Sequence, residues 1–167
     1  NQANQANQGG AMVLTTGNKS EMACGYATLY GDMCGGYNAL KDLYKTQVYN
    51  LAHWRNGAKP IDSLGPMGEG INTRILTKAP TAELRPDQKD QDSLPPYDEL
   101  DAILMGLIEE DLSPSQMAER GHNPETVAKV ARLVKLSEYK RRQSATGAKL
   151  SARAFARERR YPIVNGY

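Results

Sequence analysis

Polar side chains that could bind a ligand gather just after the first apolar run of the chain. Residues 11–14 are apolar, residues 15–18 read Thr-Thr-Gly-Asn, and one carboxylate, Glu21, follows. An apolar run stopped by turn residues predicts a short buried strand, and a helix is expected to begin near Lys19 or Ser20 with Glu21 in its first turn. The arrangement indicates a ligand site at the carboxyl end of a strand.

A few more single residues in predicted loops and helix starts have side chains suited to phosphate or metal binding. They are Thr15, Thr16, Asn18, Lys45, Thr81 and Lys140. Each has a plain structural explanation as well, since a threonine after a strand caps turns and a glutamate in a first helical turn complements the helix dipole. The sequence contains no Walker A, G-x-G-x-x-G or G-x-S-x-G motif, so single residues do not decide the chemistry.

Composition sets broad limits on the class of protein. The chain has 167 residues and a net charge of +2, which fits one domain with a real core. No apolar run reaches the roughly 18 residues of a membrane span, so we expect a soluble, cytoplasmic protein without membrane partners. Two cysteines and two histidines are too few for a disulfide framework or a zinc site. Both cysteines, Cys24 and Cys34, are therefore expected to be reduced and structural.

Periodicity predicts a mostly helical chain with little strand. A helix is expected over residues 43–54, with Asp42 as N-cap and an apolar stripe of Tyr44, Val48, Leu51 and Ala52. Residues 98–108, capped by Asp98, carry apolar residues at i, i+3, i+4, i+7 and i+8. Ser113-Pro114 and Asn123-Pro124 begin two further helices. Residues 31–42 and 87–100 read as mobile loops, and residues 74–76 as an extended piece.

The basic residues are concentrated near the end of the sequence. Residues 140–160 contain eight basic residues and one acid, so the remainder of the chain carries a net charge of −5. Such a segment can bind nucleic acid, a phosphate-bearing ligand or an acidic partner surface. Because it contains few aromatic residues and no nucleic-acid motif, we favour a ligand-phosphate role or an oligomer interface.

Three separated stretches of the chain resemble one family. They are "LTTGNKSEMACGYATLYGD", "LTKAPTAELRPDQKDQDSLPPYDELDAIL" and "EYKRRQ" followed by "KLSARAFARERRYPI". Together they are similar to the C-terminal part of the synthetase domain of bacterial glutamine-dependent NAD synthetases. The resemblance implies an α/β adenine-nucleotide α-hydrolase-like fold, a doubly wound parallel sheet, represented here by its mostly helical C-terminal part. Residues 11–167 would form this part, and residues 1–10 a low-complexity leader or a segment flanking a gap.

The resemblance also implies an activity. The family activates the nicotinate carboxylate of deamido-NAD with ATP and Mg²⁺, releases pyrophosphate, and lets ammonia displace AMP to give NAD. In the glutamine-dependent form a separate nitrilase-like glutaminase domain supplies the ammonia. A homo-oligomer is expected on the same ground, without a nucleic-acid partner.

Site residues follow from the same resemblance. The positions that match ATP contacts of the family are Thr16, Lys45 and Thr81. Those that match deamido-NAD contacts are Glu21, Tyr26, Ala27, Thr28, Leu29, Tyr139 and Lys140, and Glu21 also matches a magnesium ligand. Residues 87–93 resemble a loop that covers the site. No residue of this chain is assigned a catalytic role.

Two features depart from the family pattern. The pyrophosphate loop SGGxDS and its magnesium-binding aspartate are absent from the sequence, and Leu29 stands where short ammonia-dependent forms often have lysine. We therefore expect a fragment of a larger enzyme that is inactive by itself. The alternatives are a non-catalytic module that binds ATP or a dinucleotide, and a nucleic-acid-binding protein acting through the basic segment.

Overall fold

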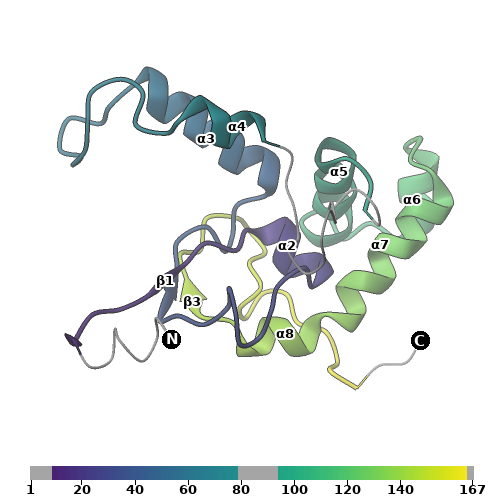
Figure 1. The fold of residues 1–167 in the computed structure, drawn as a ribbon. Coiled ribbons are helices and arrows are strands. Elements are labelled where there is room, and N and C mark those ends of the chain that lie inside the picture. The colour runs from purple at the N-terminus through teal and green to yellow at the C-terminus, as the bar shows by residue number, and fades with distance from the viewer. Residues whose placement is uncertain (1–8, 79–93, 165–167) are drawn as a thin grey trace.

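A computed structural model of the chain describes residues 9–78 and 94–164. The elements are, in order, β1 (Leu14–Thr15), α2 (Lys19–Cys24), β2 (Tyr37–Asn38), α3 (Lys45–Gly57), α4 (Thr73–Thr77), α5 (Tyr97–Ile108), α6 (Pro114–Glu119), α7 (Pro124–Leu136), α8 (Glu138–Gln143) and β3 (Thr146–Gly147). Helices dominate, and the labelled strands β1 and β3 lie to the left of α2 and below α3 (Figure 1).

The strands form a parallel sheet in the order β1-β2-β3. Leu14 lies opposite Tyr37, and Asn38 lies opposite Gly147. A Cβ atom on Gly147 would come within 2.3 Å of the carbonyl oxygen of Asn38, so only glycine lets β3 approach this closely. The parallel sheet confirms the expected class of fold, in which ligands bind at the carboxyl ends of strands.

The strand predictions were only partly right. The first strand is Leu14–Thr15 rather than residues 11–14, and the Leu14 side chain is 57% exposed instead of buried. The buried residue of this strand is Thr15. β2 lies inside the glycine-containing segment that was predicted to be a mobile loop, because two paired residues leave no alternating pattern in the sequence.

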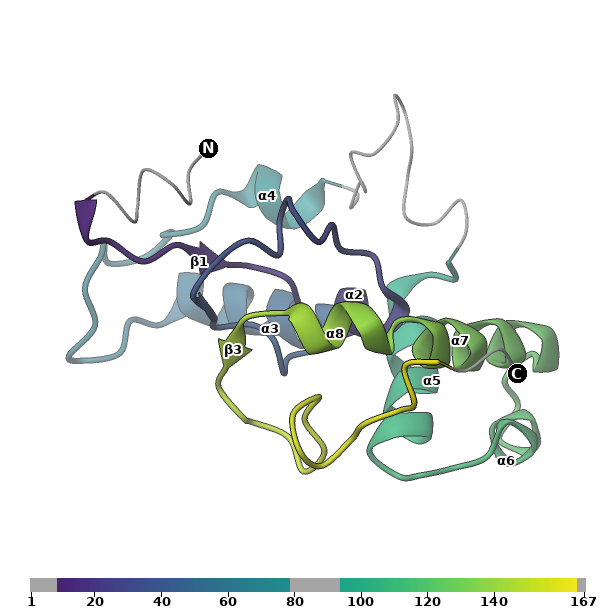
Figure 2. The same cartoon turned by 90° about the horizontal axis from the view of Figure 1, so that it is seen from below.

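The core is built from α5, α6 and α7, with α2 packed against α5 and α7. All five apolar positions predicted for one face of α5 are buried: Leu100, Ile103, Leu104, Leu107 and Ile108. α7 contributes Val127, Val130 and Val134, and α6 contributes Met117. Seen from below, α7 and α8 follow one another, and the segment after β3 loops away from α8 and returns beside α7 (Figure 2).

Helix caps agree with the sequence at two of the four predicted positions. Ser113 forms a capping box with Gln116, and Asn123 accepts hydrogen bonds from the first turn of α7. Asp98 lies in the first turn of α5, whose N-cap is Pro96, so its predicted capping role is wrong. The predicted Asp42 cap of α3 is also wrong, since Tyr44 occupies that position.

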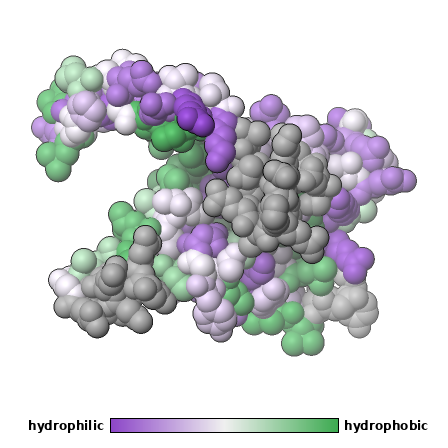
Figure 3. Space-filling model, in the orientation of Figure 1, coloured by the Kyte–Doolittle hydropathy of each residue, from purple (hydrophilic) through white to green (hydrophobic). Residues whose placement is uncertain are grey.

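α3 and α4 form an arm that stands away from the other helices (Figure 1). The predicted apolar stripe is right only at Tyr44, the N-cap of α3, which is buried in the core. Val48, Leu51 and Ala52 are not buried, and Leu51 is 45% exposed. Residues 74–76, expected to be extended, lie in α4. The space-filling view shows a hollow beneath this arm (Figure 3).

Cys24 and Cys34 are both free, as expected. Burial raises the pKa of the Cys24 thiol to about 12, which keeps it protonated at neutral pH and favours a packing role. Among the described residues no helix is both long and apolar enough to cross a membrane.

Candidate functional site

The turn after β1 ends in a capping box that fixes the side chain of Glu21. The Glu21 N–H donates to Asn18 Oδ1 at 3.0 Å, and the Asn18 N–H donates to Glu21 Oε2 at 3.1 Å. The capping box thereby satisfies two of the backbone donors that lack a partner within the helix at the start of α2. The carboxylate is held at the carboxyl end of β1, where the sequence predicted a ligand site.

Glu21 pairs with Lys45, the first residue of α3. Lys45 Nζ lies 3.1 Å from Glu21 Oε1, and each side chain is 20% exposed. The Lys45 ammonium also lies 5.8 Å from the ring centroid of Tyr49 and 5.5 Å from that of Tyr97. The structure therefore brings together one cation and one carboxylate, both reachable from solvent, at the starts of two helices that follow neighbouring parallel strands.

Asp101, on the buried face of α5, ties these two helix starts to each other. Ser20 Oγ donates to Asp101 Oδ1 at 2.5 Å and accepts from the Lys45 N–H at 2.9 Å. The Thr46 N–H donates to Asp101 Oδ2 at 2.8 Å. Burial raises the pKa of the Asp101 carboxyl, and the hydrogen bonds from Ser20 and Thr46 offset this in part. A buried carboxylate thus sets where α3 begins relative to α2.

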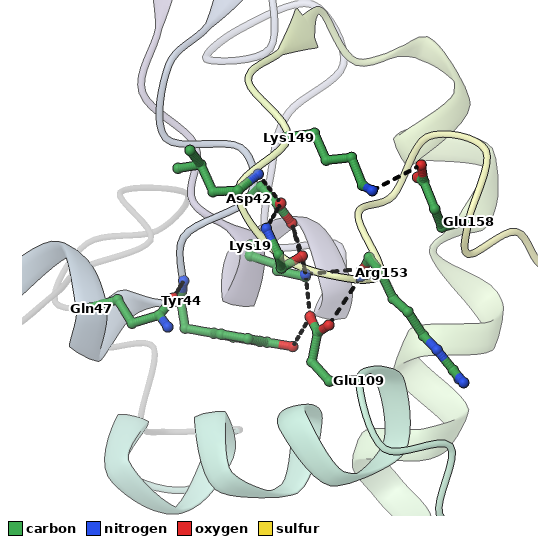
Figure 4. A network of polar contacts seen from close by, with 10 residues as sticks. Lys19, Asp42, Tyr44, Gln47, Glu109, Lys149, Arg153 and Glu158 are labelled. Carbon is green, nitrogen blue, oxygen red and sulfur yellow. Dashed lines mark hydrogen bonds and ion pairs between the residues drawn. The ribbon is translucent and has the colours of Figure 1, made fainter.

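Lys19 makes a second buried connection (Figure 4). Its ammonium, which is fully buried, lies 2.7 Å from Asp42 Oδ1 and 2.5 Å from Glu109 Oε1. It also donates to Ser151 Oγ at 2.7 Å and to the carbonyl of Arg153 at 3.0 Å. These contacts join the start of α2 to the end of α5 and to residues 151–153 near the end of the chain.

Asp42 belongs to this network rather than to the cap of α3. It accepts from the backbone N–H groups of Leu150 at 2.7 Å and Ser151 at 2.6 Å, besides its contact with Lys19. Burial alone would raise the pKa of the Asp42 carboxyl, but the hydrogen bonds from Lys19, Ser151 and Leu150 outweigh it and lower the pKa. Asp42 is therefore ionised and committed to internal partners at neutral pH.

α8 holds the other end of α2. Lys140 Nζ donates to the carbonyl oxygens of Gly25 at 2.6 Å and Ala27 at 2.9 Å. Arg141, buried and paired with Glu138, donates to the carbonyl of Ala23 at 2.8 Å. Gly25 ends α2 with a φ of +77°. The loop at residues 25–29 is thereby fixed against α8.

Comparison with known proteins gives the family. A family model described as NAD synthase matches residues 2–144. The chain belongs to the NAD synthase family. It is 59% identical over 164 residues to the glutamine-dependent NAD(+) synthetase of Acinetobacter baylyi, covering 97% of this chain and 29% of that protein. The corresponding protein of Xanthomonas campestris is 54% identical over 164 residues, with 97% and 28% covered. The chain therefore spans less than a third of the length of these relatives.

A solved structure supports the NAD synthase fold. The glutamine-dependent NAD(+) synthetase of Cytophaga hutchinsonii superposes with a TM-score of 0.68 at 23% identity, over 97% of this chain and 26% of that one. The resemblance to NAD synthetases stated from the sequence is confirmed, and so is the α/β fold.

The residues that the NAD synthase resemblance selected lie in two groups. Glu21 and Lys45 contact each other, and Lys140 contacts the backbone of the segment that contains Tyr26, Ala27, Thr28 and Leu29. Thr16 is exposed between β1 and α2, and Tyr139 is 42% exposed. Thr81 and residues 87–93 lie outside the described residues. The ligand contacts of all these residues stay predictions.

The residues that support the Glu21–Lys45 pair were not predicted from the sequence to do so. They are Ser20, Lys19, Asp42, Glu109 and Asp101. One signal was available, because Asp101 sits beside Leu100 within an otherwise apolar helix face. A carboxylate at such a position is buried only when it has partners. Lys19 gave no comparable signal, since its acceptors are 23 and 90 residues away in the sequence.

Glu21 is the carboxylate at this site that a metal ion could reach. The described residues hold no group of three or more His, Cys, Asp or Glu side chains that could bind a metal ion. Magnesium keeps several waters and is satisfied by one or two protein carboxylates together with phosphate oxygens. A partly exposed single carboxylate therefore fits such an ion, with the Lys45 contact as a competitor.

Proposed function

We propose that this chain is part of a glutamine-dependent NAD synthetase, which uses ATP to amidate deamido-NAD. The nicotinate carboxylate attacks ATP and releases pyrophosphate, and ammonia then displaces AMP to form the amide. The ammonia would come from glutamine, cleaved by a glutaminase domain outside these residues. Membership of the family and the names of relatives at 59% and 54% identity support this proposal.

The Glu21–Lys45 pair carries the proposal at the level of residues. Adenylation brings a carboxylate and a triphosphate together, so positive charge has to be placed where the anions meet. Lys45 supplies such a charge at the start of the 13-residue helix α3, whose positive dipole end adds to it. Its contacts with two aromatic rings limit the directions in which the ammonium can point.

We assign Glu21 the role of magnesium ligand. Magnesium, when bound, would neutralise charge on the phosphates of ATP. Glu21 would hold it through the oxygen that faces Lys45, while the other oxygen keeps the hydrogen bond from the Asn18 N–H. Lys45, freed from the carboxylate, is then available to an ATP phosphate together with Thr16 and Thr81.

The dinucleotide would lie along residues 26–29, next to α8. In this proposal Lys140 acts mainly by fixing that segment, since its ammonium donates to two backbone carbonyls there. Tyr139 precedes it and is partly exposed, which leaves its ring free to contact a ligand. The protein is further proposed to be cytoplasmic and to form homo-oligomers.

The test is NAD formation by the full-length protein that carries this segment, with deamido-NAD, ATP, Mg²⁺ and either ammonia or glutamine. Glu21→Gln and Lys45→Met are each expected to lower kcat/KM by about a hundredfold or more. Glu119→Gln, an isosteric change on the exposed face of α6, should leave it unchanged within about twofold. If Glu21→Gln and Lys45→Met behave like this control, the site assignment is wrong.

The isolated chain separates the enzyme proposal from a simple binding module. It is expected to form no NAD, because it lacks the SGGxDS loop of the family. Robust NAD formation by a chain of verified mass would contradict this expectation. Tight ATP binding by a full-length protein that makes no NAD under any ammonia supply would favour the binding module instead.

A further inference from the structure

A cavity of about 350 Å³ lies beside β3, between α8 and the segment that follows the strand. Its lining is strongly basic. The cationic side chains that line it are Lys41, Arg141, Arg142, Lys149, Arg157 and Arg160. Among the described lining residues, Asp42 is the one carboxylate. Six cations against one acid give a surface whose potential attracts anions.

Asp42 does little to neutralise this cavity. Its two oxygens accept hydrogen bonds from Lys19 Nζ at 2.7 Å, from the Leu150 N–H at 2.7 Å and from the Ser151 N–H at 2.6 Å. The negative charge of Asp42 is therefore balanced from the protein interior by Lys19, which does not line the cavity.

Three of the six cations have carboxylate partners, and three do not. Arg141 and Arg142 share Glu138, and Lys149 lies 3.4 Å from Glu158. Lys41 Nζ and Arg160 Nε donate instead to the backbone carbonyls of Ala145 and Ala156, at 2.6 and 2.5 Å. Within residues 9–78 and 94–164 no ion pair joins Lys41, Arg157 or Arg160 to an acid. Their charge is left over for a ligand.

The cavity differs from the site proposed above for ATP. Lys41 and Asp42 follow β2, and Ala148 and Lys149 follow β3, so it opens at the carboxyl ends of these two strands. Figure 4 shows Asp42 on the side of the buried Lys19 network that faces Lys149. The proposed ATP and dinucleotide residues Glu21, Lys45 and Lys140 are not part of its lining.

We propose that this cavity is a second anion site, which binds a phosphate-bearing ligand of the size of pyrophosphate. Guanidinium groups match phosphate oxygens through paired N–H donors, and four of the six cations are arginines. The exposed Arg157 and Arg160 supply the charge that lacks a carboxylate partner, and Lys41 supplies charge from the partly buried wall. The ligand is either free pyrophosphate or the phosphate chain of a nucleotide.

Calorimetric titration of the chain with pyrophosphate at low salt tests the site. The double change Arg157→Ala and Arg160→Ala is expected to weaken binding roughly tenfold or more, because two charge-assisted contacts are lost. The matched control, Lys129→Ala with Lys135→Ala, removes two exposed cations of α7 and should change the Kd by less than about twofold. All four substituted side chains are exposed, and circular dichroism verifies that both variants are folded.

Two further experiments, ATP competition and the Lys45→Met variant, identify the ligand and distinguish this cavity from the proposed ATP site. ATP that displaces pyrophosphate identifies a nucleotide phosphate chain as the ligand, and ATP that does not displace it identifies free pyrophosphate. Lys45→Met should leave pyrophosphate affinity unchanged. The proposal is overturned if pyrophosphate does not bind, if the arginine and lysine double variants weaken it equally, or if only Lys45→Met weakens it. None of these three results depends on whether the protein makes NAD.

Discussion

Replacing Lys19 by methionine is the most direct test of how this fold is held together. The change shortens the side chain by one atom and removes a fully buried ammonium that contacts Asp42 and Glu109. Removing one partner of a buried ion pair costs about 3–5 kcal/mol, because the other charge stays buried without compensation. Asp42 keeps two backbone N–H donors and the Ser151 hydroxyl. We therefore expect the low end, a loss of about 3 kcal/mol in the free energy of unfolding.

Urea unfolding followed by circular dichroism measures this loss, and two further variants show its cause. Arg120→Met breaks the ion pair with Glu110, in which both side chains are about half exposed, and should cost no more than about 1 kcal/mol. Lys19→Met combined with Glu109→Gln removes a charge of each sign. The double variant should lose less free energy of unfolding than Lys19→Met and Glu109→Gln lose together, by about 1 kcal/mol or more.

The result that would refute this reasoning is a Lys19→Met chain as stable as Arg120→Met. The network would then contribute no net stability, and hydrophobic packing of α2 alone would hold it against α5 and α7. Strict additivity of Lys19→Met and Glu109→Gln would refute the narrower claim that these two charges compensate each other across the 2.5 Å contact.

Two other changes have predictable outcomes. Gly25→Ala should lower the free energy of unfolding in urea by about 1–3 kcal/mol, because a Cβ there would lie 2.3 Å from Ser137 Oγ at a φ of +77°. The control Gly57→Ala, whose Cβ would have nothing within 4 Å, should lower it by less than about 0.5 kcal/mol. Equal losses for the two variants would contradict this prediction. Asp42 has a lowered pKa when folded, so it stabilises the fold above its unfolded pKa of about 3.8 and loses this contribution as the pH falls through the folded value. The stability gap between wild type and Asp42→Asn should therefore narrow from pH 6 to pH 3, and a constant gap would contradict the ion-pair role.

The parts of the fold that could be predicted from the sequence are those with local causes. The apolar spacing of residues 100–108 and the Ser113 and Asn123 caps act within one helix, and all of them are found. The two-residue strands β2 and β3 have no such pattern, since their pairing depends on backbone contacts between residues more than a hundred positions apart. Beyond Tyr44 the apolar stripe predicted for α3 was wrong, because an amphipathic pattern does not say whether a partner surface is present.

In the candidate site, too, contacts with local causes could be predicted from the sequence and long-range contacts could not. Glu21 was placed correctly in a first helical turn because the Asn18 capping box is local. Its partner Lys45 was named as a separate candidate residue and as a family match, but nothing in the spacing of 24 residues indicates that it contacts Glu21. Asp42 looked like the cap of α3, which begins three residues later, but its true partners, Lys19, Leu150 and Ser151, are distant in sequence.

The buried charges share one consequence for the proposed reaction. α2 has six residues, too few to be stable by itself. Directional contacts hold both ends of α2. At its start, Lys19 and Ser20 contact Asp42 and Asp101. At its end, Arg141 donates to the carbonyl of Ala23, and Glu138 balances the charge of this buried arginine. We infer that this framework, rather than apolar packing, sets the direction of Glu21 toward Lys45. Loosening it should therefore lower activity before it abolishes folding, which Asp101→Asn in the full-length protein would reveal as a fall in kcat with a retained helical signal.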